Sequence, residues 1–252
     1  MKHLLATSIT IALLSLGLAG CGEKQATKEV TSDAFVTIQG QDLIKPAGTK
    51  LFIMGTTLGN WLNPEGYMFK FNKTNSARCI NEMFCQLVGP DFTADFWKAF
   101  KDNYVTREDI RFIKEQGANT IRLPFHYKLF TDEDYMGLTA AQDGFARGDS
   151  RVEWCRESDL YLILDMHDAP GGQTGDNIAD SYGYPWLFDS DASQQLYCDI
   201  WRRIADRYKD EPVILGYELF NEPIAPYFEN VEGHSGKLED VYKKGVAAIR
   251  EV

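Results

Sequence analysis

The chain contains four apolar runs, and each run ends in polar residues or glycine. The runs cover residues 51–54, 119–124, 160–167 and 213–220. Short runs that are apolar almost throughout are typical of strands buried on both faces of a parallel sheet. The pattern therefore predicts four parallel strands.

A helix is expected after each run. The stretch from Thr106 to Asp109 resembles a capping box, and the helix that it opens ends at Gly117. A short helix opens at residues 150–153, and Asp191 with Gln194 can cap the next helix. Apolar faces with helical spacing mark the last two helices: Leu196, Ile200, Trp201, Ile204, Ala205 and Tyr208 in one, and Leu238, Val241, Tyr242, Val246 and Ile249 in the other. Strands that alternate with helices indicate an α/β fold.

Polar or glycine-rich residues mark the carboxyl end of every predicted strand. They are residues 58–60, Arg122, residues 167–168 and residues 221–222. In a (β/α)8 barrel these ends form the face that carries the active site, and an open doubly wound sheet is the competing arrangement. A doubly wound sheet usually has a phosphate-binding glycine loop after its first strand. Residues 55–59 match no such pattern, so the barrel is favoured.

The tripeptide Asn221-Glu222-Pro223 stands where the last apolar run stops. Proline cannot donate to a sheet ladder, and it disfavours the α region for the residue before it. We therefore expect the strand to end at an extended Glu222. A carboxyl group held rigidly at a strand end suits acid/base catalysis, whereas a loop glutamate in water is the alternative interpretation.

Composition and charge narrow the class of partner. The 252 residues are 44% hydrophobic and 25% charged, which is typical of a globular protein with one large domain or two small ones. The formal net charge of −11 argues against nucleic acid, because phosphate binding needs a basic surface. It is compatible with a neutral ligand such as a sugar.

Residues 1–20 have the pattern of an export signal, with a short basic start and an apolar stretch that ends in small residues. Because Cys21 follows directly, the segment resembles a bacterial lipoprotein signal in which Cys21 is lipidated. An ordinary signal peptide with an unrelated cysteine is the alternative. The polar residues 21–34 then form a flexible tether. The protein is thus predicted to be exported and anchored to a bacterial membrane through lipid.

The other cysteines are Cys79, Cys85, Cys155 and Cys198. Their spacing fits no zinc site, so no metal is predicted. An exported protein can form disulfides, and Cys79 and Cys85 lie close enough in a loop-like region to pair. Cys155 and Cys198 fall in helical patterns and are expected to be buried thiols.

Short motifs stand in order along the predicted strand ends. They are Gly59-Asn60-Trp61 with residues 64–67, then residues 119–124, 164–167 and 216–223. Together they resemble glycoside hydrolase family 5, the cellulase-type (β/α)8 glycosidases. The resemblance implies a TIM barrel and glycosidase activity, and it implies no cofactor. Only the first four βα units are present, so residues 35–252 are interpreted as the N-terminal half of the catalytic domain.

The resemblance implies a role for each matching residue. Glu222 matches the general acid/base, and Asn221 matches the residue that holds the sugar 2-hydroxyl. Arg122 matches an arginine that keeps the nucleophile ionised, and His167 matches a histidine of the cleavage subsite. Glu65 is expected to contact sugar hydroxyls. An acid/base carboxyl must stay protonated near neutral pH, which takes partial burial and a like-charged neighbour.

Some of these side chains have a structural alternative. Arg122 and Glu218 can form an interior ion pair, which is the preferred interpretation for Glu218. His167 can be a hydrogen-bonded core histidine, and His126 is expected at the rim. The glycine-rich residues 168–177 either fold over the cleft or only connect two elements.

Aromatic residues gather in the loops after the first three strands. Flat rings can stack on the apolar C–H faces of sugars, and Trp61 and Trp186 are the expected platforms. Loop packing is the alternative for the whole group: Trp61, Tyr67, Phe69, Tyr127, Tyr182, Tyr184 and Trp186.

No residue of the chain matches the nucleophile of the family. A retaining glycosidase needs two carboxyls about 5–5.5 Å apart, and in family 5 the second one ends a seventh strand. Asp165 and Asp168 stand near a strand end, but the pattern gives neither that role. The sequence is therefore expected to be truncated, with unpaired edges on its first and fourth strands, and inactive alone.

The leading prediction is an exported glycosidase that cleaves β-linked glucans with retention, as cellulases do. A surface lipoprotein that only binds glycans is the alternative from another class. Residues 64–67 and 169–172 resemble exo-glucanase members of the family, so exo-acting β-1,3-glucan and mannan specificity also stay open.

Overall fold

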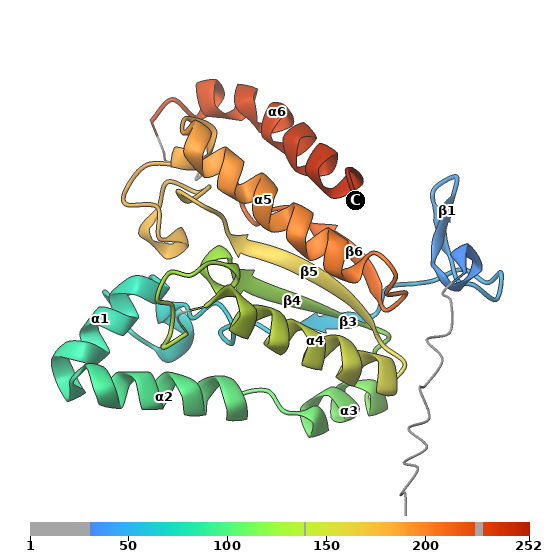
Figure 1. The fold of residues 1–252 in the computed structure, drawn as a ribbon, viewed down its shortest axis with the longest axis horizontal. Coiled ribbons are helices and arrows are strands. Elements are labelled where there is room, and N and C mark those ends of the chain that lie inside the picture. The colour runs from blue at the N-terminus through green and yellow to red at the C-terminus, as the bar shows by residue number, and fades with distance from the viewer. Residues whose placement is uncertain (1–30, 139, 225–228) are drawn as a thin grey trace, which may run out of the picture. The chain divides into compact units, whose positions relative to one another are not determined.

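Strands of the described chain form a four-stranded parallel sheet and a separate hairpin (Figure 1). A computed structural model describes residues 31–138, 140–224 and 229–252. The parallel sheet has the order β3-β4-β5-β6, with β3 (Gly55–Thr57), β4 (Thr120–His126), β5 (Tyr161–Asp168) and β6 (Ile214–Glu218). The hairpin, β1 (Thr37–Gln39) and β2 (Asp42–Ile44), was not predicted.

The predicted signal peptide and the predicted lipidation site, Cys21, lie outside the described residues, as does most of the predicted tether. The last tether residues form a short 3-10 turn, Ser32–Ala34. Within the described residues, none of the helices combines the length and the apolar character needed to cross a bilayer.

The register of the sheet brings the strand ends to one edge. Thr57 on β3 pairs with Arg122 on β4, and Asp165 on β5 pairs with Glu218 on β6. Strands β4, β5 and β6 each pair in parallel with the preceding strand of this sheet, across a helical connection. This topology confirms the predicted α/β fold, a partial (β/α)8 barrel, and it gathers the polar strand ends at one face.

The first strand lies later than the sequence predicted. Strand β3 begins at Gly55, whereas Phe52, Ile53 and Met54 of the predicted run are exposed. Asn119 bonds to the backbone at this entrance: its Oδ1 accepts from Met54 N–H at 3.0 Å, and its Nδ2 donates to Phe52 O at 2.6 Å. The apolar run therefore precedes the sheet and does not form its edge strand.

Six helices occur in the described part of the chain: α1 (Ala77–Val88), α2 (Pro90–Asn103), α3 (Arg107–Glu115), α4 (Ala141–Glu157), α5 (Asp191–Tyr208) and α6 (Val231–Arg250). Helix α3 begins at the predicted capping box, in which Thr106 and Asp109 bond reciprocally. Helix α4 starts well before residue 150, and Ser190, not Asp191, caps α5. The pair α1 and α2 was not predicted.

The predicted disulfide between Cys79 and Cys85 is wrong. Both residues lie in α1, and both thiols are free. Six helical residues rise about 9 Å, which exceeds the roughly 7 Å between Cα atoms that a disulfide can span. Cys155 is a buried free thiol, as predicted, and Cys198 is half-buried.

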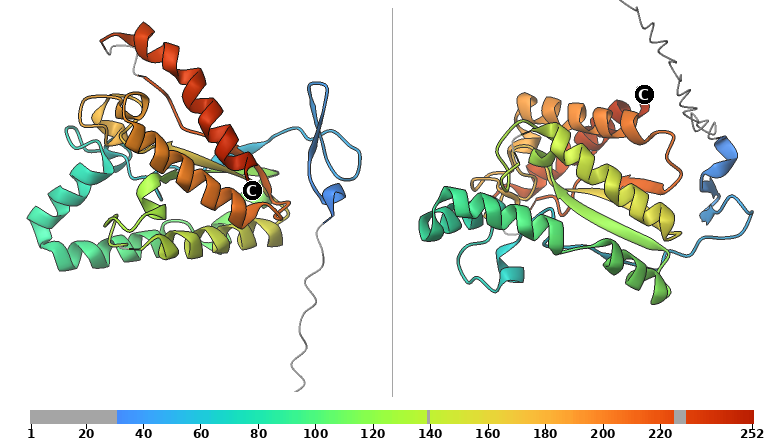
Figure 2. Two further views of the ribbon diagram at one scale, coloured as in Figure 1. Left: turned by 45° about the horizontal axis from the view of Figure 1, so that its top comes forward. Right: turned by 60° about the horizontal axis from the view of Figure 1, so that its bottom comes forward.

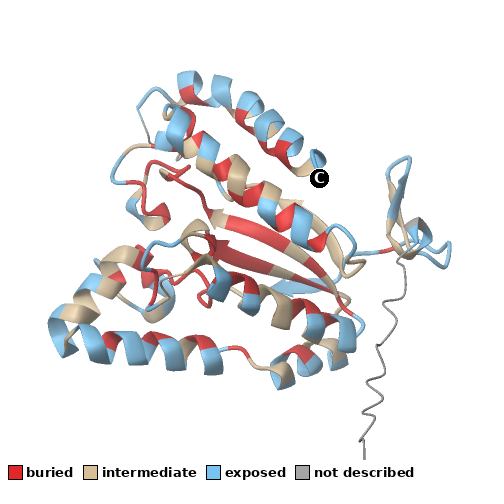
Figure 3. Ribbon diagram, viewed as in Figure 1, coloured by how far each residue is buried: buried red, intermediate tan, exposed pale blue. Residues whose placement is uncertain are grey.

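Helices α4 and α5 lie across the sheet, and two further views show the same arrangement (Figures 1 and 2). Leu162, Leu164 and Met166 alternate along β5 and are buried, as the colouring of Figure 3 shows for this strand. Ile163 and His167 on the other face of β5 are only half-buried. The helix-covered face is thus the core, and the opposite face carries the polar groups.

Candidate active site

Arg122 lies at the centre of a charged group that we call the Arg122 cluster: Arg122, Asp165, His167, Glu218, Asn221 and Glu65. Its guanidinium binds Glu218 in a bidentate manner, with Nε 2.6 Å from Oε2 and Nη2 2.7 Å from Oε1. Nη2 also donates to Asn221 Oδ1 at 2.9 Å and lies 2.9 Å from Asp165 Oδ2. The hydrogen bonds to Glu218 raise the pKa of Arg122, although burial acts in the opposite direction. The predicted pair with Glu218 is therefore confirmed, and it belongs to a larger network.

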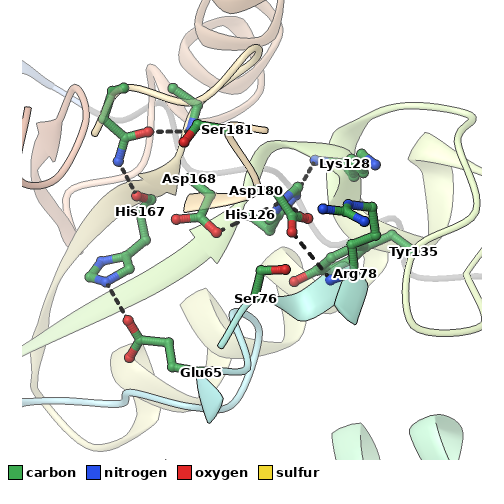
Figure 4. A network of polar contacts seen from close by, with 12 residues as sticks. Glu65, Ser76, Arg78, His126, Lys128, Tyr135, His167, Asp168, Asp180 and Ser181 are labelled. Carbon is green, nitrogen blue, oxygen red and sulfur yellow. Dashed lines mark hydrogen bonds and ion pairs between the residues drawn. The ribbon is translucent and has the colours of Figure 1, made fainter. Parts of the chain in front are cut away.

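His167 lies between two carboxylates. Its Nδ1 is 2.7 Å from Asp165 Oδ2, and its Nε2 is 3.5 Å from Glu65 Oε1 (Figure 4 shows His167 and Glu65). Burial alone would lower the pKa of His167, but the bonds to Asp165 and Glu65 raise it to about 10. Both ring nitrogens thus lie near carboxylates, which favour the protonated form of His167.

Asn221 lies between the two basic side chains of the cluster. Its amide nitrogen lies 3.3 Å from His167 Nε2, and its oxygen accepts from Arg122. The amide can donate to His167 Nε2 only where that nitrogen is unprotonated, because an N–H group cannot accept. Protonation of His167 Nε2 would thus leave the amide hydrogens of Asn221 to a ligand.

Asp165 joins the two cations of the cluster. It is completely buried, and its Oδ2 contacts both Arg122 and His167. Burial raises the pKa of Asp165, while the two cations oppose this effect. Sequence reasoning noted Asp165 but gave it no role. A carboxylate inside an apolar run was the signal, because a buried charge needs partners.

Glu222 stands beside this cluster on an unusual backbone. Its φ is +40°, so the predicted extended conformation is wrong. Its negative charge contributes to raising the pKa of Arg122 and of Tyr67, which places Glu222 near both. The side chain is exposed. The partial burial that an acid/base requires is therefore not supplied by the described residues alone.

Glu65 reaches the site from the loop after β3. Its backbone N–H donates to Asn60 Oδ1 at 3.0 Å, and Tyr67 donates to Glu65 Oε2 at 3.2 Å. Burial, followed by the charge of Glu65, raises the pKa of Tyr67. The structure thus brings Glu65, His167 and Asn221 together, and their roles toward a sugar stay predictions.

Trp61 is not a sugar platform, and this prediction is wrong. Its side chain is 0% exposed, and its Nε1 donates to Lys101 O at 3.0 Å. The guanidinium of Arg151 covers the ring, 4.4 Å from its centroid. A ring enclosed in this way cannot meet a sugar.

Trp186 is 48% exposed and lines a cavity of about 280 Å³. Tyr127, Tyr182 and Asp180 also line this cavity, together with the glycines of the loop after β5. An exposed ring beside a cavity is compatible with sugar stacking. The role of Trp186 as a platform stays a prediction.

A second polar group, the His126 cluster (His126, Asp168, Asp180 and Tyr135), lies deeper in the molecule (Figure 4). The ring of His126 stacks between Tyr127 and Tyr135, with centroid distances of 4.8 and 4.4 Å. Its Nε2 lies 3.2 Å from Asp180 Oδ2. The predicted rim position of His126 is wrong, because the side chain is completely buried.

The loop after β5 is packed against the molecule. Gln173 and Thr174 are buried within it, and Asp180 accepts from the backbone N–H of Arg78 at the start of α1. The loop is therefore more than a connection. Asp180 was missed as a site residue because its partners Arg78 and His126 are distant in sequence, and Gln173 was missed because its bond to Asn221 spans 48 residues.

The sequence profile of Cellulase (glycosyl hydrolase family 5) matches residues 80–252, which is more than half of the chain. This chain belongs to glycosyl hydrolase family 5. The matched region holds Arg122, His167, Asn221 and Glu222, whereas Glu65 precedes it. The family 5 chain thus carries its matching polar residues within β4, at the end of β5 and directly after β6.

Three curated relatives bear different names. A Beta-xylosidase of Phanerodontia chrysosporium is 30% identical over 222 residues, which are 86% of this chain and 44% of that protein. Endoglucanase C of Acetivibrio thermocellus is 34% identical over 157 residues, 62% of this chain and 42% of that one. A Glucan 1,3-beta-glucosidase of Kluyveromyces lactis is 27% identical over 208 residues, 75% and 46% of the two chains. The family 5 chain thus spans about half the length of these relatives.

A solved structure gives the same picture of the fold. The rutinosidase from Aspergillus niger is 17% identical, and it superposes with a TM-score of 0.62 over 79% of this chain and 59% of that chain. At this identity the likeness concerns the fold of the family 5 chain alone.

Proposed function

We propose that this chain supplies the acid/base half of a retaining glycoside hydrolase site for β-linked glucans. The observation that carries the proposal is the position of Glu222. It follows the end of β6, near the half-buried Arg122 and next to Asn221, whose oxygen accepts from Arg122 and whose nitrogen lies 3.3 Å from His167 Nε2. Family membership and the names of two glucan-active relatives support the reaction class and the substrate class.

Glu222 acts on the leaving group in this mechanism. Its carboxyl proton passes to the glycosidic oxygen while the C–O bond breaks, and a carboxylate nucleophile takes the sugar as a glycosyl ester. Glu222 then removes a proton from the water that cleaves this ester. Asn221 donates from its amide to the sugar 2-hydroxyl, and Arg122 holds the amide oxygen of Asn221 fixed.

The second carboxyl of the mechanism is assigned to no described residue. Asp165 is completely buried, and its Oδ2 already contacts two cations. Asp168 is buried too, and burial raises its pKa well above the usual range, so it is a poor nucleophile. We therefore propose that the 252 residues alone do not complete hydrolysis.

Substrate specificity follows from the cavity beside Trp186. Its exposed ring and Tyr182 offer apolar surface for sugar rings that extend away from Glu222. Glucans linked β-1,4 are the leading substrate, and exo-acting β-1,3-glucan or mannan cleavage is the alternative. A Beta-xylosidase among the relatives adds xylosides to the panel that should be tested.

The proposed location is a bacterial membrane, reached by export and lipid attachment at Cys21. The Cys21→Ala variant should lose its membrane partition in a fractionation experiment. If that variant stays with the membrane as strongly as the parent chain, the lipid anchor is wrong.

Hydrolysis of soluble β-glucans tests the function. The complete product of the reading frame is compared with the 252 residues alone, with Glu222→Gln, and with Glu232→Gln as an exposed control in the first turn of α6. The proposal predicts activity in the complete product and the control, and a loss of at least about 100-fold in Glu222→Gln. Glycan binding without hydrolysis by the complete product would instead indicate a binding lipoprotein. Hydrolysis by the 252 residues alone would contradict the proposal that this chain supplies only the acid/base half of the site.

A further inference from the structure

Gln173 connects the two strand ends that carry the candidate site. Its side chain is 1% exposed. The amide Nε2 donates to His167 O at 2.7 Å and to Asn221 O at 2.8 Å, while Oε1 accepts from Ala169 N–H at 3.0 Å. All three partners are backbone groups at the ends of β5 and β6. The two bonds donated by Nε2 therefore hold the end of β5 against the end of β6, and the bond to Oε1 fixes the orientation of the amide.

The backbone at residues 222–224, which we call the corner, needs such support. Glu222 and Ile224 have φ values of +40° and +56°. Left-handed backbone is costly for residues that have a Cβ, and it persists only where the surroundings impose it. Gln173 holds the corner on both sides, because its side chain binds Asn221 O and its own carbonyl accepts from Ile224 N–H at 2.8 Å. Glu222 thus lies between two hydrogen bonds to one residue.

Glycine at position 172 allows Gln173 to take this place. Gly172 has φ of +75°, and a Cβ there would lie 2.0 Å from the Cβ of Ser181. Any other residue would push the loop away from Ser181 and move Gln173 with it. The approach of Gln173 to the two strand ends therefore depends on a backbone position that only glycine fits.

We propose that Gln173 is a positioning residue for the candidate acid/base. It sets the backbone conformation of Glu222 and, through it, the direction of the Glu222 carboxyl relative to His167 and Asn221. The catalytic consequence rests on the proposed function, but the geometric claim does not.

Backbone NMR of the 252-residue chain tests the geometric claim. In Gln173→Met the glutamine amide is replaced by an apolar chain of similar length. We expect the ¹³Cα and ¹³Cβ shifts of Glu222 to leave left-handed values, and exchange of the Ile224 amide to accelerate at least tenfold. Gln194→Met is the matched control, because Gln194 is also buried and its Nε2 donates to Leu187 O at 2.9 Å, a partner outside β5, β6 and residues 221–224. Unchanged Glu222 shifts in folded Gln173→Met, or the same change in Gln194→Met, would overturn the proposal.

Gln173→Glu covers the case in which the methionine variant does not fold. A carboxylate keeps the size and the acceptor but cannot donate to the two carbonyls. A protonated carboxyl can donate to one of them. The Glu222 shifts should therefore leave left-handed values at high pH and return partly as the pH falls. Shifts that stay at the parent values across this range contradict the proposal.

Activity of the complete product gives a separate readout. There, Gln173→Met should lower kcat about 100-fold and change KM by less than about threefold, since a misplaced catalytic group slows chemistry more than binding. An inactive parent would count against the proposed function, while the NMR result would still decide the role of Gln173. Equal losses in Gln173→Met and Gln194→Met would contradict positioning.

Discussion

His126 and His167 lie at the ends of neighbouring strands of one sheet, yet their surroundings favour opposite charge states. In the His126 cluster, Nδ1 accepts from the backbone N–H of Lys128 at 3.2 Å, which requires an unprotonated nitrogen. In the Arg122 cluster, both nitrogens of His167 face carboxylates. Burial lowers the pKa of His126, whereas the bonds to Asp165 and Glu65 raise that of His167 to about 10.

The difference indicates how many ionised partners offset the lowering of a histidine pKa by burial. His126 has one, Asp180, because burial raises the pKa of its second neighbour, Asp168, far above the usual range. His167 has two, and it retains some contact with water. The His126 cluster thus favours an uncharged His126, and through Asp180 it ties the loop after β5 to α1. The Arg122 cluster keeps fixed charges at the face where the chemistry is proposed.

Asp165→Asn should produce the largest effect, because it removes the carboxylate shared by Arg122 and His167. We expect a loss of roughly 3 kcal/mol in the free energy of unfolding, since two half-buried basic groups lose a completely buried partner. The pKa of His167 should fall toward its ordinary value. Urea unfolding and ¹⁵N NMR of the ring measure the two effects. Asp199→Asn, at an exposed ion pair on α5, is the control and should cost less than about 1 kcal/mol.

Asp180→Asn should have an intermediate effect, confined to the other cluster. The variant weakens the bonds to His126 and to the start of α1, which should cost about 2 kcal/mol of unfolding free energy. The pKa of His167 should not change. A shift of His167 in this variant would mean that the two clusters are not independent.

The pH dependence of stability should separate the histidines. The folded pKa of His167 is raised from 6.5, so its contribution is complete below pH 6.5 and is lost as the pH rises toward about 10. The folded pKa of His126 is lowered, so its contribution is complete above pH 6.5 and is lost as the pH falls. Melting curves should show a flatter alkaline limb in His167→Gln and a flatter acid limb in His126→Gln. A flatter acid limb in His167→Gln together with a flatter alkaline limb in His126→Gln would contradict the two pKa directions.

Trp186→Ala should have the smallest effect on stability, because the ring is half exposed and belongs to neither cluster. We expect a change below about 0.5 kcal/mol in unfolding free energy. Affinity for a β-glucan oligosaccharide should fall roughly tenfold, which is about 1.4 kcal/mol. Calorimetric titration measures this, and Trp186→Phe should keep most of the affinity. Unchanged affinity in Trp186→Ala would contradict the predicted role of Trp186 as a sugar platform.

Local patterns in the sequence were sufficient for β4, β5, β6 and the start of α3. Apolar runs and a capping box depend on neighbouring residues, and the family motifs placed Arg122, His167 and Asn221 at one edge. Strand β3 was misplaced because its apolar run is exposed, and α1 and α2 were missed.

Long-range contacts explain the errors at the site. Trp61 is enclosed by Lys101 and Arg151, far along the chain, so its burial left no local signal. The left-handed Glu222 depends on Gln173, 48 residues before Asn221. Pro223, which follows Glu222, predicted an extended Glu222. This local preference is overridden because tertiary hydrogen bonds fix the backbone at the corner.

Glu222 is proposed to protonate the glycosidic oxygen of the leaving group. Hydrolysis by Glu222→Gln in the complete product should be compared on a β-glucan and on a dinitrophenyl β-glycoside, whose leaving group needs no proton. We predict a loss of at least about 100-fold on the glucan, a much smaller loss of glycoside cleavage, and formation of a glycosyl azide when azide is added. Equal losses on the two substrates, with no azide product, would contradict the claim.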